Sequence, residues 1–163
     1  VIGYDQRKSY ITNLLKQDGI DVVFSEFDIP YDKNNLYIYS SAIPIDSEKF
    51  SKFHDKENVI SRPEFLQNLS NENKIIGITG THGKTSTTAL LSHIFHFNNV
   101  NVSYIYGGVT NFNGIGGHYG DSDQPIILET DEAFNTFEKI LISDLLVLNI
   151  DSCLLYTSPS PRD

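Results

Sequence analysis

The sequence predicts an α/β protein made of two parts, each with a mainly parallel, doubly wound sheet. Short apolar runs alternate with helix-like segments along the chain, a pattern typical of parallel strands joined by helices. The polar stretch 70–74 separates the two parts. With 163 residues, of which 39% are hydrophobic, the chain is long enough for two small packed domains.

The first part is predicted to begin with the end of a strand at residues 1–3. Ser9 to Gln17 should form a helix, because its apolar residues share one face and Gly19 follows as a stop signal. A second helix should run from the serine cap at Ser61, with Glu64 three residues later, to about Leu69. The other expected elements are strands at 21–25, 36–40 and 59–60 and a polar helix at 47–56.

The second part should open with a strand at 74–79 and continue with a helix at 85–97. This helix carries Leu90, Ile94 and Phe97 on one stripe. Residues 109–124 are rich in Gly, Asn and Asp and indicate an irregular loop. The remaining expected elements are strands at 102–106, 126–128 and 145–149 and a helix at 131–139.

The most informative segment joins the strand 74–79 to the helix 85–97. It reads Gly80-Thr81-His82-Gly83-Lys84-Thr85-Ser86. A glycine-lysine-threonine turn at this position is typical of a phosphate-binding loop. The helix N-terminus favours an anion, Lys84 is long enough to contact β- and γ-phosphates, and the Thr85 hydroxyl suits Mg²⁺. Ile78 replaces the first glycine of the general pattern, so the alternative is a glycine-rich turn with a chance lysine.

An acidic segment, Glu129-Thr130-Asp131-Glu132, directly follows the apolar strand 126–128. Ligands of open α/β sheets collect beyond the carboxyl ends of the strands. We therefore predict that Glu129 shares a Mg²⁺ ion with Thr85. The alternative is that Asp131 and Glu132 only provide favourable charge at a helix start.

Composition excludes several classes of protein. The net charge of −9 argues against a general nucleic-acid binder, and the apolar runs are too short to span a bilayer. A single cysteine excludes an intramolecular disulfide, which favours a reducing, cytoplasmic location. The five histidines show no zinc-ligand spacing, and no nucleophile elbow is present.

Five stretches together resemble the bacterial Mur ligases, in matching order and spacing over nearly all of residues 1–152. They are Gly80 to Ser86, Glu129 to Glu132, Ser40-Ser41-Ala42-Ile43, Arg62-Pro63-Glu64-Phe65-Leu66 and Leu148-Asn149-Ile150-Asp151. The resemblance implies a partial Rossmann-like domain at 1–70 that binds a UDP-linked substrate. It also implies the first portion of a P-loop-type central ATPase domain at 71–152.

The function implied by this resemblance is ATP-dependent amide formation in peptidoglycan synthesis, with ATP and Mg²⁺ as cofactors. L-alanine would be added to UDP-N-acetylmuramate through an acyl phosphate. The implied roles are catalysis for Lys84, nucleotide binding for Gly80 to Ser86, Mg²⁺ binding for Thr85 and Glu129, and substrate binding for Asp5, Ser40 and Ser41. Two alternatives are a ligase that joins a recycled tripeptide to UDP-N-acetylmuramate and a nucleotide-binding module without ligase activity. No nucleic-acid or membrane partner is expected, and the oligomeric state stays open.

The chain also departs from the family pattern. Gly3-Tyr4-Asp5 stands where Gly-Ser-Asp is usual, and Ala133-Phe134 replaces Ser-Asp or Tyr-Asp. The opening strand, its glycine-rich loop, the rest of the central domain and a C-terminal domain are not found, so we expect this stretch alone to be inactive. Residues 153–163 can be written as codons of a sequencing-library adapter, so the natural sequence is expected to end near Ser152. The alternative is a natural Pro/Ser-rich disordered terminus.

Overall fold

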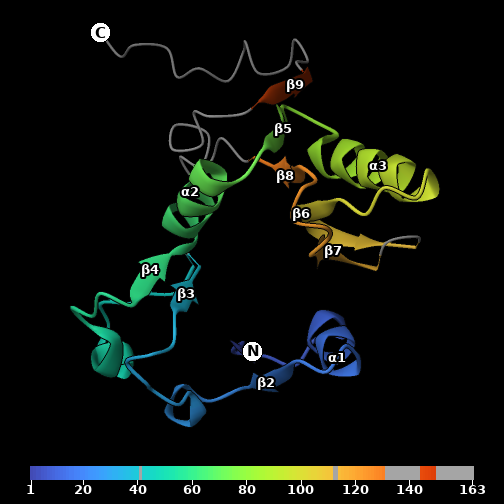
Figure 1. Cartoon of the computed structure of the whole chain (residues 1–163). Helices are drawn as coiled ribbons and strands as arrows, with labels where there is room; N and C mark the ends of the chain where they lie inside the picture. Colours follow the sequence, from blue (N-terminus) through green and yellow to red (C-terminus); the bar gives the residue numbers. More distant parts are fainter. Residues whose placement is uncertain (41, 112–113, 131–143, 150–163) are drawn as a thin grey trace, which may run out of the picture. The chain divides into compact units, whose positions relative to one another are not determined.

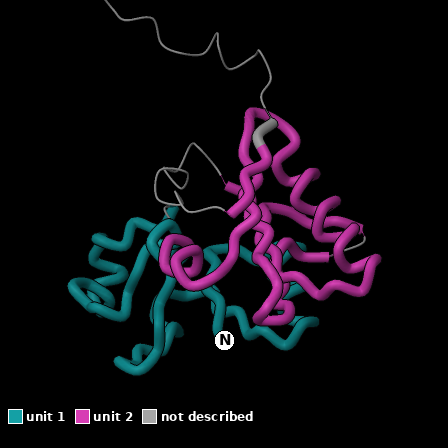
Figure 2. Tube along the Cα trace, turned by 45° about the horizontal axis from the view of Figure 1, so that its top comes forward, with its two compact units in different colours: residues 1–65 teal, residues 66–163 magenta. Residues whose placement is uncertain are grey.

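A computed structural model describes residues 1–40, 42–111, 114–130 and 144–149. The chain divides into two compact units, Val1–Phe65 and Leu66–Asp163, shown in separate colours in Figure 2. The helix α2 (Arg62–Glu72) spans this division, so the first residues of the expected polar link, Ser70 to Glu72, are helical. The roles assigned to domains 1–70 and 71–152 stay predictions.

Unit 1 contains two separate two-stranded parallel sheets (Figure 1). One pairs β1 (Ile2–Tyr4) with β2 (Asp21–Val23), and the other pairs β3 (Tyr37–Tyr39) with β4 (Val59–Ser61). The helical elements before α2 are α1 (Tyr10–Gln17) and two 3₁₀ helices, η1 (Glu26–Asp28) and η2 (Glu48–Phe53). The α-helix expected at 47–56 is therefore a shorter 3₁₀ element, with a kink at Phe50.

The start of α1 shows how local sequence defines an element. The Ser9 side chain accepts a hydrogen bond from the Thr12 N–H, and the Thr12 hydroxyl oxygen accepts one from the Ser9 N–H. This capping box satisfies two N–H groups that a helix start would otherwise leave unpaired. Gly19 then takes a φ of +78°, which lets the chain turn away after the helix.

Unit 2 is built around a five-stranded sheet in the order β7-β6-β8-β5-β9. Its strands are β5 (Ile75–Gly80), β6 (Ser103–Thr110), β7 (Gly114–His118), β8 (Ile126–Glu129) and β9 (Leu145–Asn149). All pairs are parallel except β6 with β7. The fold is thus α/β with mainly parallel sheets, as the alternation of strands and helices predicts.

The region predicted to be an irregular loop, 109–124, contains part of an antiparallel hairpin. Strand β6 continues to Thr110, and β7 returns beside it. The prediction was wrong because the glycines here serve a strand rather than a loop. A Cβ at Gly116 would lie 2.1 Å from the Tyr106 carbonyl oxygen, so the two backbones approach closely only because residue 116 is glycine.

Helix α3 (Lys84–Phe97) packs against β5, β6 and β8 of the sheet (Figure 1). Its buried residues are small or hydroxylated: Thr88, Ala89 and Ser92. The Thr88 hydroxyl donates to the Lys84 carbonyl oxygen and the Ser92 hydroxyl to that of Ala89, so neither polar group is buried unpaired. The stripe of Leu90, Ile94 and Phe97 faces away from the sheet and is 55%, 48% and 80% exposed.

The core of unit 2 lies between α3 and the sheet. Six buried residues form it: Ile78, Ala89, Val102, Tyr104, Tyr106 and Ile127. Strand β5 lies between β8 and β9, and its burial on both faces is typical of a parallel strand inside an α/β sheet. Across the residues that the structure describes, we find no helix long and apolar enough to cross a membrane.

Candidate nucleotide and metal site

The predicted phosphate-binding loop lies between the carboxyl end of β5 and the start of α3. Gly80 ends the strand with a φ of +138°, and Gly83 precedes the helix with a φ of +71°. Both values fall where side chains are strongly disfavoured, so the turn needs these two glycines. The first N–H groups of a helix have no partner within the helix, and Gly83 has no side chain to cap them. The turn can therefore present N–H groups and the positive helix end to a phosphate.

Ile78, where the general pattern has its first glycine, belongs to the strand rather than to the turn. Its side chain is fully buried, and its carbonyl oxygen accepts hydrogen bonds from the N–H and the hydroxyl of Thr130. The turn begins two residues later, at Gly80. The missing glycine therefore leaves the turn itself intact.

Lys84 stands at the first position of α3. Its Nζ donates a hydrogen bond of 2.6 Å to the Gly80 carbonyl oxygen, across the turn. The ammonium group is thus held at the mouth of the turn and not extended into solvent. Thr81, His82 and Ser86 complete the segment, with His82 and Ser86 exposed.

The structure brings Glu129 and Thr85 together. Parallel pairing of β5 with β8 places Glu129 opposite Ile78, at the carboxyl ends of both strands. The Thr85 hydroxyl donates a hydrogen bond of 2.7 Å to Glu129 Oε1. The Gly107 N–H donates one of 2.7 Å to Glu129 Oε2. Both oxygens of the carboxylate are therefore fixed by groups from two different elements.

The Thr85 hydroxyl and the Glu129 carboxylate offer the kind of oxygen ligands that Mg²⁺ prefers. A hydroxyl and a carboxylate are hard oxygen ligands, and Mg²⁺ uses few protein ligands beside water and phosphate oxygens. No group of three or more His, Cys, Asp or Glu side chains that could hold a metal occurs among the described residues. A metal bound together with a nucleotide needs few protein ligands, because phosphate and water oxygens fill its other positions. Metal binding by Thr85 and Glu129 stays a prediction.

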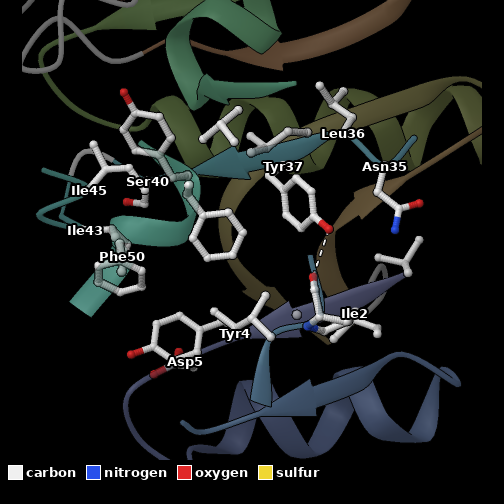
Figure 3. Close-up of a pocket in the computed structure, with 18 of the residues that line it drawn as sticks. Ile2, Tyr4, Asp5, Asn35, Leu36, Tyr37, Ser40, Ile43, Ile45 and Phe50 are labelled. Atoms are coloured by element: carbon white, nitrogen blue, oxygen red, sulfur yellow. Dashed lines mark hydrogen bonds between the residues drawn. The ribbon is translucent and has the colours of Figure 1, made fainter. Parts of the chain in front are cut away.

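The predicted substrate-binding residues lie in unit 1, on a groove of about 1070 Å³ (Figure 3). Asp5 follows β1, and its Oδ1 accepts a hydrogen bond from the Arg7 N–H. Ser40 follows β3, and its Oγ accepts one from the Ala42 N–H. Both residues line the groove, whereas Ser41 lies outside the described residues, as do Asp131 and Glu132.

The groove runs between the edges of the two small sheets. Consecutive residues of β1 and of β3 line it, whereas a wall made by a sheet face would contribute only every second residue. Aromatic side chains that the sequence did not single out add to the lining, among them Tyr4, Tyr37 and Phe50. The Tyr37 hydroxyl donates to the Pro30 carbonyl oxygen, the contact drawn in Figure 3.

Gly107 and Gly108 are the residues near Glu129 that sequence reasoning missed. They directly follow the strand expected at 102–106, and the sequence pattern assigned them no role. A glycine pair inside a strand often marks a place where another group approaches the backbone closely. This pattern could have identified the two residues. In the structure the pair lies within β6, next to both Glu129 and Thr85.

Comparison with known proteins supports the resemblance, although no protein-family model matches the chain. UDP-N-acetylmuramate–L-alanine ligase of Cytophaga hutchinsonii is 34% identical over 157 residues, covering 90% of this chain and 34% of the relative. The enzyme of the same name from Vesicomyosocius okutanii is 32% identical over 152 residues, covering 93% of this chain and 32% of the relative. The chain thus spans about a third of the length of these curated relatives.

Two solved structures share the fold. UDP-N-acetylmuramate–alanine ligase from Thermotoga maritima has a TM-score of 0.69 at 23% identity, covering 93% of this chain and 36% of the other. UDP-N-acetylmuramate:L-alanyl-γ-D-glutamyl-meso-diaminopimelate ligase from Neisseria meningitides has a TM-score of 0.70 at 21% identity, covering 94% and 54%. Sequence and fold together confirm that this chain resembles the Mur ligases, and the curated relatives it matches are UDP-N-acetylmuramate–L-alanine ligases.

Proposed function

We propose that the protein to which this chain belongs is an ATP-dependent ligase that joins L-alanine to UDP-N-acetylmuramate in the cytoplasm. The observation that carries the proposal is the meeting of Thr85 with Glu129 beside the Lys84 turn. A hydroxyl, a carboxylate and a lysine at one helix start form a set suited to a magnesium-bound triphosphate. The names of the relatives supply the substrates, UDP-N-acetylmuramate and L-alanine.

The proposed reaction has two steps. The muramoyl carboxylate attacks the γ-phosphate of ATP, which gives an acyl phosphate and releases ADP. The amino group of L-alanine then attacks the acyl carbon, and inorganic phosphate leaves as the amide forms. Two anions must approach each other in the first step, so the site must neutralise negative charge.

Different residues of this chain would bind the phosphates, the metal ion and the UDP-sugar. Lys84 and the N–H groups of the turn would hold the β- and γ-phosphates and stabilise charge as the phosphoryl group moves. Thr85 and Glu129 would hold Mg²⁺, which supplies further charge neutralisation when bound. Asp5, Ser40 and Ser41 would contact the UDP-sugar. Since the chain spans about a third of its relatives, we expect it not to complete the reaction by itself.

The test is phosphate release from ATP by the full-length protein. Release should require UDP-N-acetylmuramate and L-alanine together, because only the amine completes the second step. Rapid phosphate release without L-alanine would instead support a nucleotide-binding module that hydrolyses ATP. Omission of each substrate in turn distinguishes these outcomes.

A second candidate is ligation of a peptide instead of L-alanine to the same UDP-sugar. The solved structure from Neisseria meningitides favours it, because that enzyme's fold matches this chain as well as the alanine ligase does. Competition between L-alanine and L-alanyl-γ-D-glutamyl-meso-diaminopimelate in the same assay decides between the two. Product formed only with the tripeptide would overturn the alanine assignment and keep the ligase chemistry.

A further inference from the structure

The two glycines of β6, Gly107 and Gly108, lie beside the proposed metal ligands although neither can be a ligand through a side chain. Strand β6 pairs with β8 only from Ser103 to Ile105. Its pairing with β7 shifts register between Ile105 and Val109. Residues 106–108 therefore leave the ladder, as in a β-bulge.

This irregularity frees one backbone donor for the site. The Gly107 N–H donates a hydrogen bond of 2.7 Å to the side-chain oxygen Oε2 of Glu129, at the end of β8. A charge-assisted hydrogen bond of this kind holds a carboxylate firmly, since one partner is ionised. With Oε2 engaged by β6, Oε1 is the oxygen that faces Thr85 on α3.

The second glycine has a different, steric requirement. A Cβ at position 108 would lie 3.2 Å from the Thr85 Cγ2 methyl, closer than carbon atoms pack at their optimal separation. A Cβ at position 107 would lie 3.8 Å from Glu129 Oε2, an ordinary contact. The two positions therefore respond differently to the same added methyl group.

We propose that Gly107 and Gly108 form a positioning element for the metal–nucleotide site. Gly107 orients the Glu129 carboxylate through its N–H, and Gly108 leaves the space that the Thr85 methyl occupies, so that the Thr85 hydroxyl faces Oε1. The inference rests on the proposed nucleotide function. It adds that strand β6 positions both proposed metal ligands, Thr85 and Glu129, without itself binding the metal.

The test compares variants of the full chain by the affinity of Mn²⁺, a spectroscopic substitute for Mg²⁺, in the presence of ADP. Gly108→Ala should weaken Mn²⁺ binding by about tenfold or more, the usual effect of disturbing groups that orient metal ligands. Gly117→Ala on β7 is the matched control and should bind as the wild type does, because it adds the same methyl group at a position where a Cβ meets nothing within 4 Å. Unfolding by heat checks that each variant is folded.

A second substitution that restores Mn²⁺ affinity distinguishes a loss of positioning from general damage to the fold. Thr85→Ser removes the Cγ2 methyl and keeps the hydroxyl, so Gly108→Ala with Thr85→Ser should regain most of the lost affinity. Failure of the rescue, or wild-type binding by Gly108→Ala, overturns the inference and leaves the proposed function standing. Mn²⁺–ADP binding that is absent in the wild type, or unaffected by Glu129→Gln, overturns the proposed function and the inference together.

Discussion

At the scale of single residues, the site depends on charges placed by backbone geometry. Lys84 is held over the turn by the Gly80 carbonyl oxygen, and Glu129 is held by Thr85 and Gly107. Each of these contacts joins residues at an end or irregularity of an element, where backbone and side-chain groups are free of the regular ladder. These three side chains are therefore held in place by contacts within the protein.

Removal of the lysine tests the electrostatic part of this arrangement. Lys84→Ala should lower kcat of the full-length enzyme by roughly 100-fold or more, because preorganised charge at the phosphoryl group is lost. Lys74→Ala is the matched control, since Lys74 precedes the opposite end of the same strand. The kcat of each variant is obtained from steady-state ligation rates. A loss of only a few fold in Lys84→Ala would show that the lysine does not contact the reacting phosphates.

The proximity of the glycine turn, Thr85 and Glu129 was predictable from their places relative to the strands. A strand, a glycine turn and a helix start put Lys84 and Thr85 at one end of the sheet, and parallel strands end at the same edge. The contacts of Gly107 and Gly108 were not predictable from spacing. They depend on where β6 leaves its neighbours, which only the register of the sheet reveals.

At the scale of elements, sequence patterns predict structure well where local signals determine it, and less well where tertiary packing determines it. The capping box of α1 and the strand before the turn are local signals, and both elements are present. The inward face of α3 was different. Thr88, Ala89 and Ser92 are buried on it and Leu91 and Phe95 pack against the core, whereas the apolar stripe with Phe97 faces outward. Hydrophobic periodicity cannot distinguish these two faces.

The hairpin strand β7 is linked to α3 by a pair of histidines. The His118 ring stacks on Tyr104 with centroids 5.3 Å apart and meets His96 edge to face at 5.1 Å. Its Nε2 lies 2.9 Å from Asn101 Oδ1. Desolvation, and then the charge of His96, lower the pKa of His118 below its usual value of 6.5. The folded chain therefore favours the neutral ring.

This shift predicts how stability changes with pH. The unfolded chain binds the proton more readily, so the stabilisation is complete above pH 6.5 and is lost as pH falls from there through the lowered pKa of the folded state. His118→Phe keeps a stacking ring and cannot titrate. Its free energy of unfolding should fall less than that of the wild type between pH 7.5 and 5, as measured by urea unfolding. Equal slopes in the two proteins would remove His118 from the explanation.

At the scale of the whole molecule, the chain carries unpaired strand edges. In the part that the structure describes, β1 pairs only with β2 and β3 only with β4, and their other edges line the groove of unit 1. Apolar side chains accompany these edges, with Ile2 51% and Ile38 46% exposed. Unpaired edges with exposed apolar residues are templates for pairing with another chain.

We therefore expect the chain to self-associate through the edge of β3. A charge on such an edge opposes pairing, so Ile38→Lys should reduce the associated fraction at a given protein concentration. Ile94→Lys on α3 is the matched control, because its side chain is similarly exposed, at 48%, but on a helix whose backbone groups are already paired. Sedimentation velocity over a concentration series gives the associated fraction of each variant. A larger effect of Ile94→Lys would place the association on the outward stripe of α3, and a monomeric wild type would show that the open edges are protected in solution.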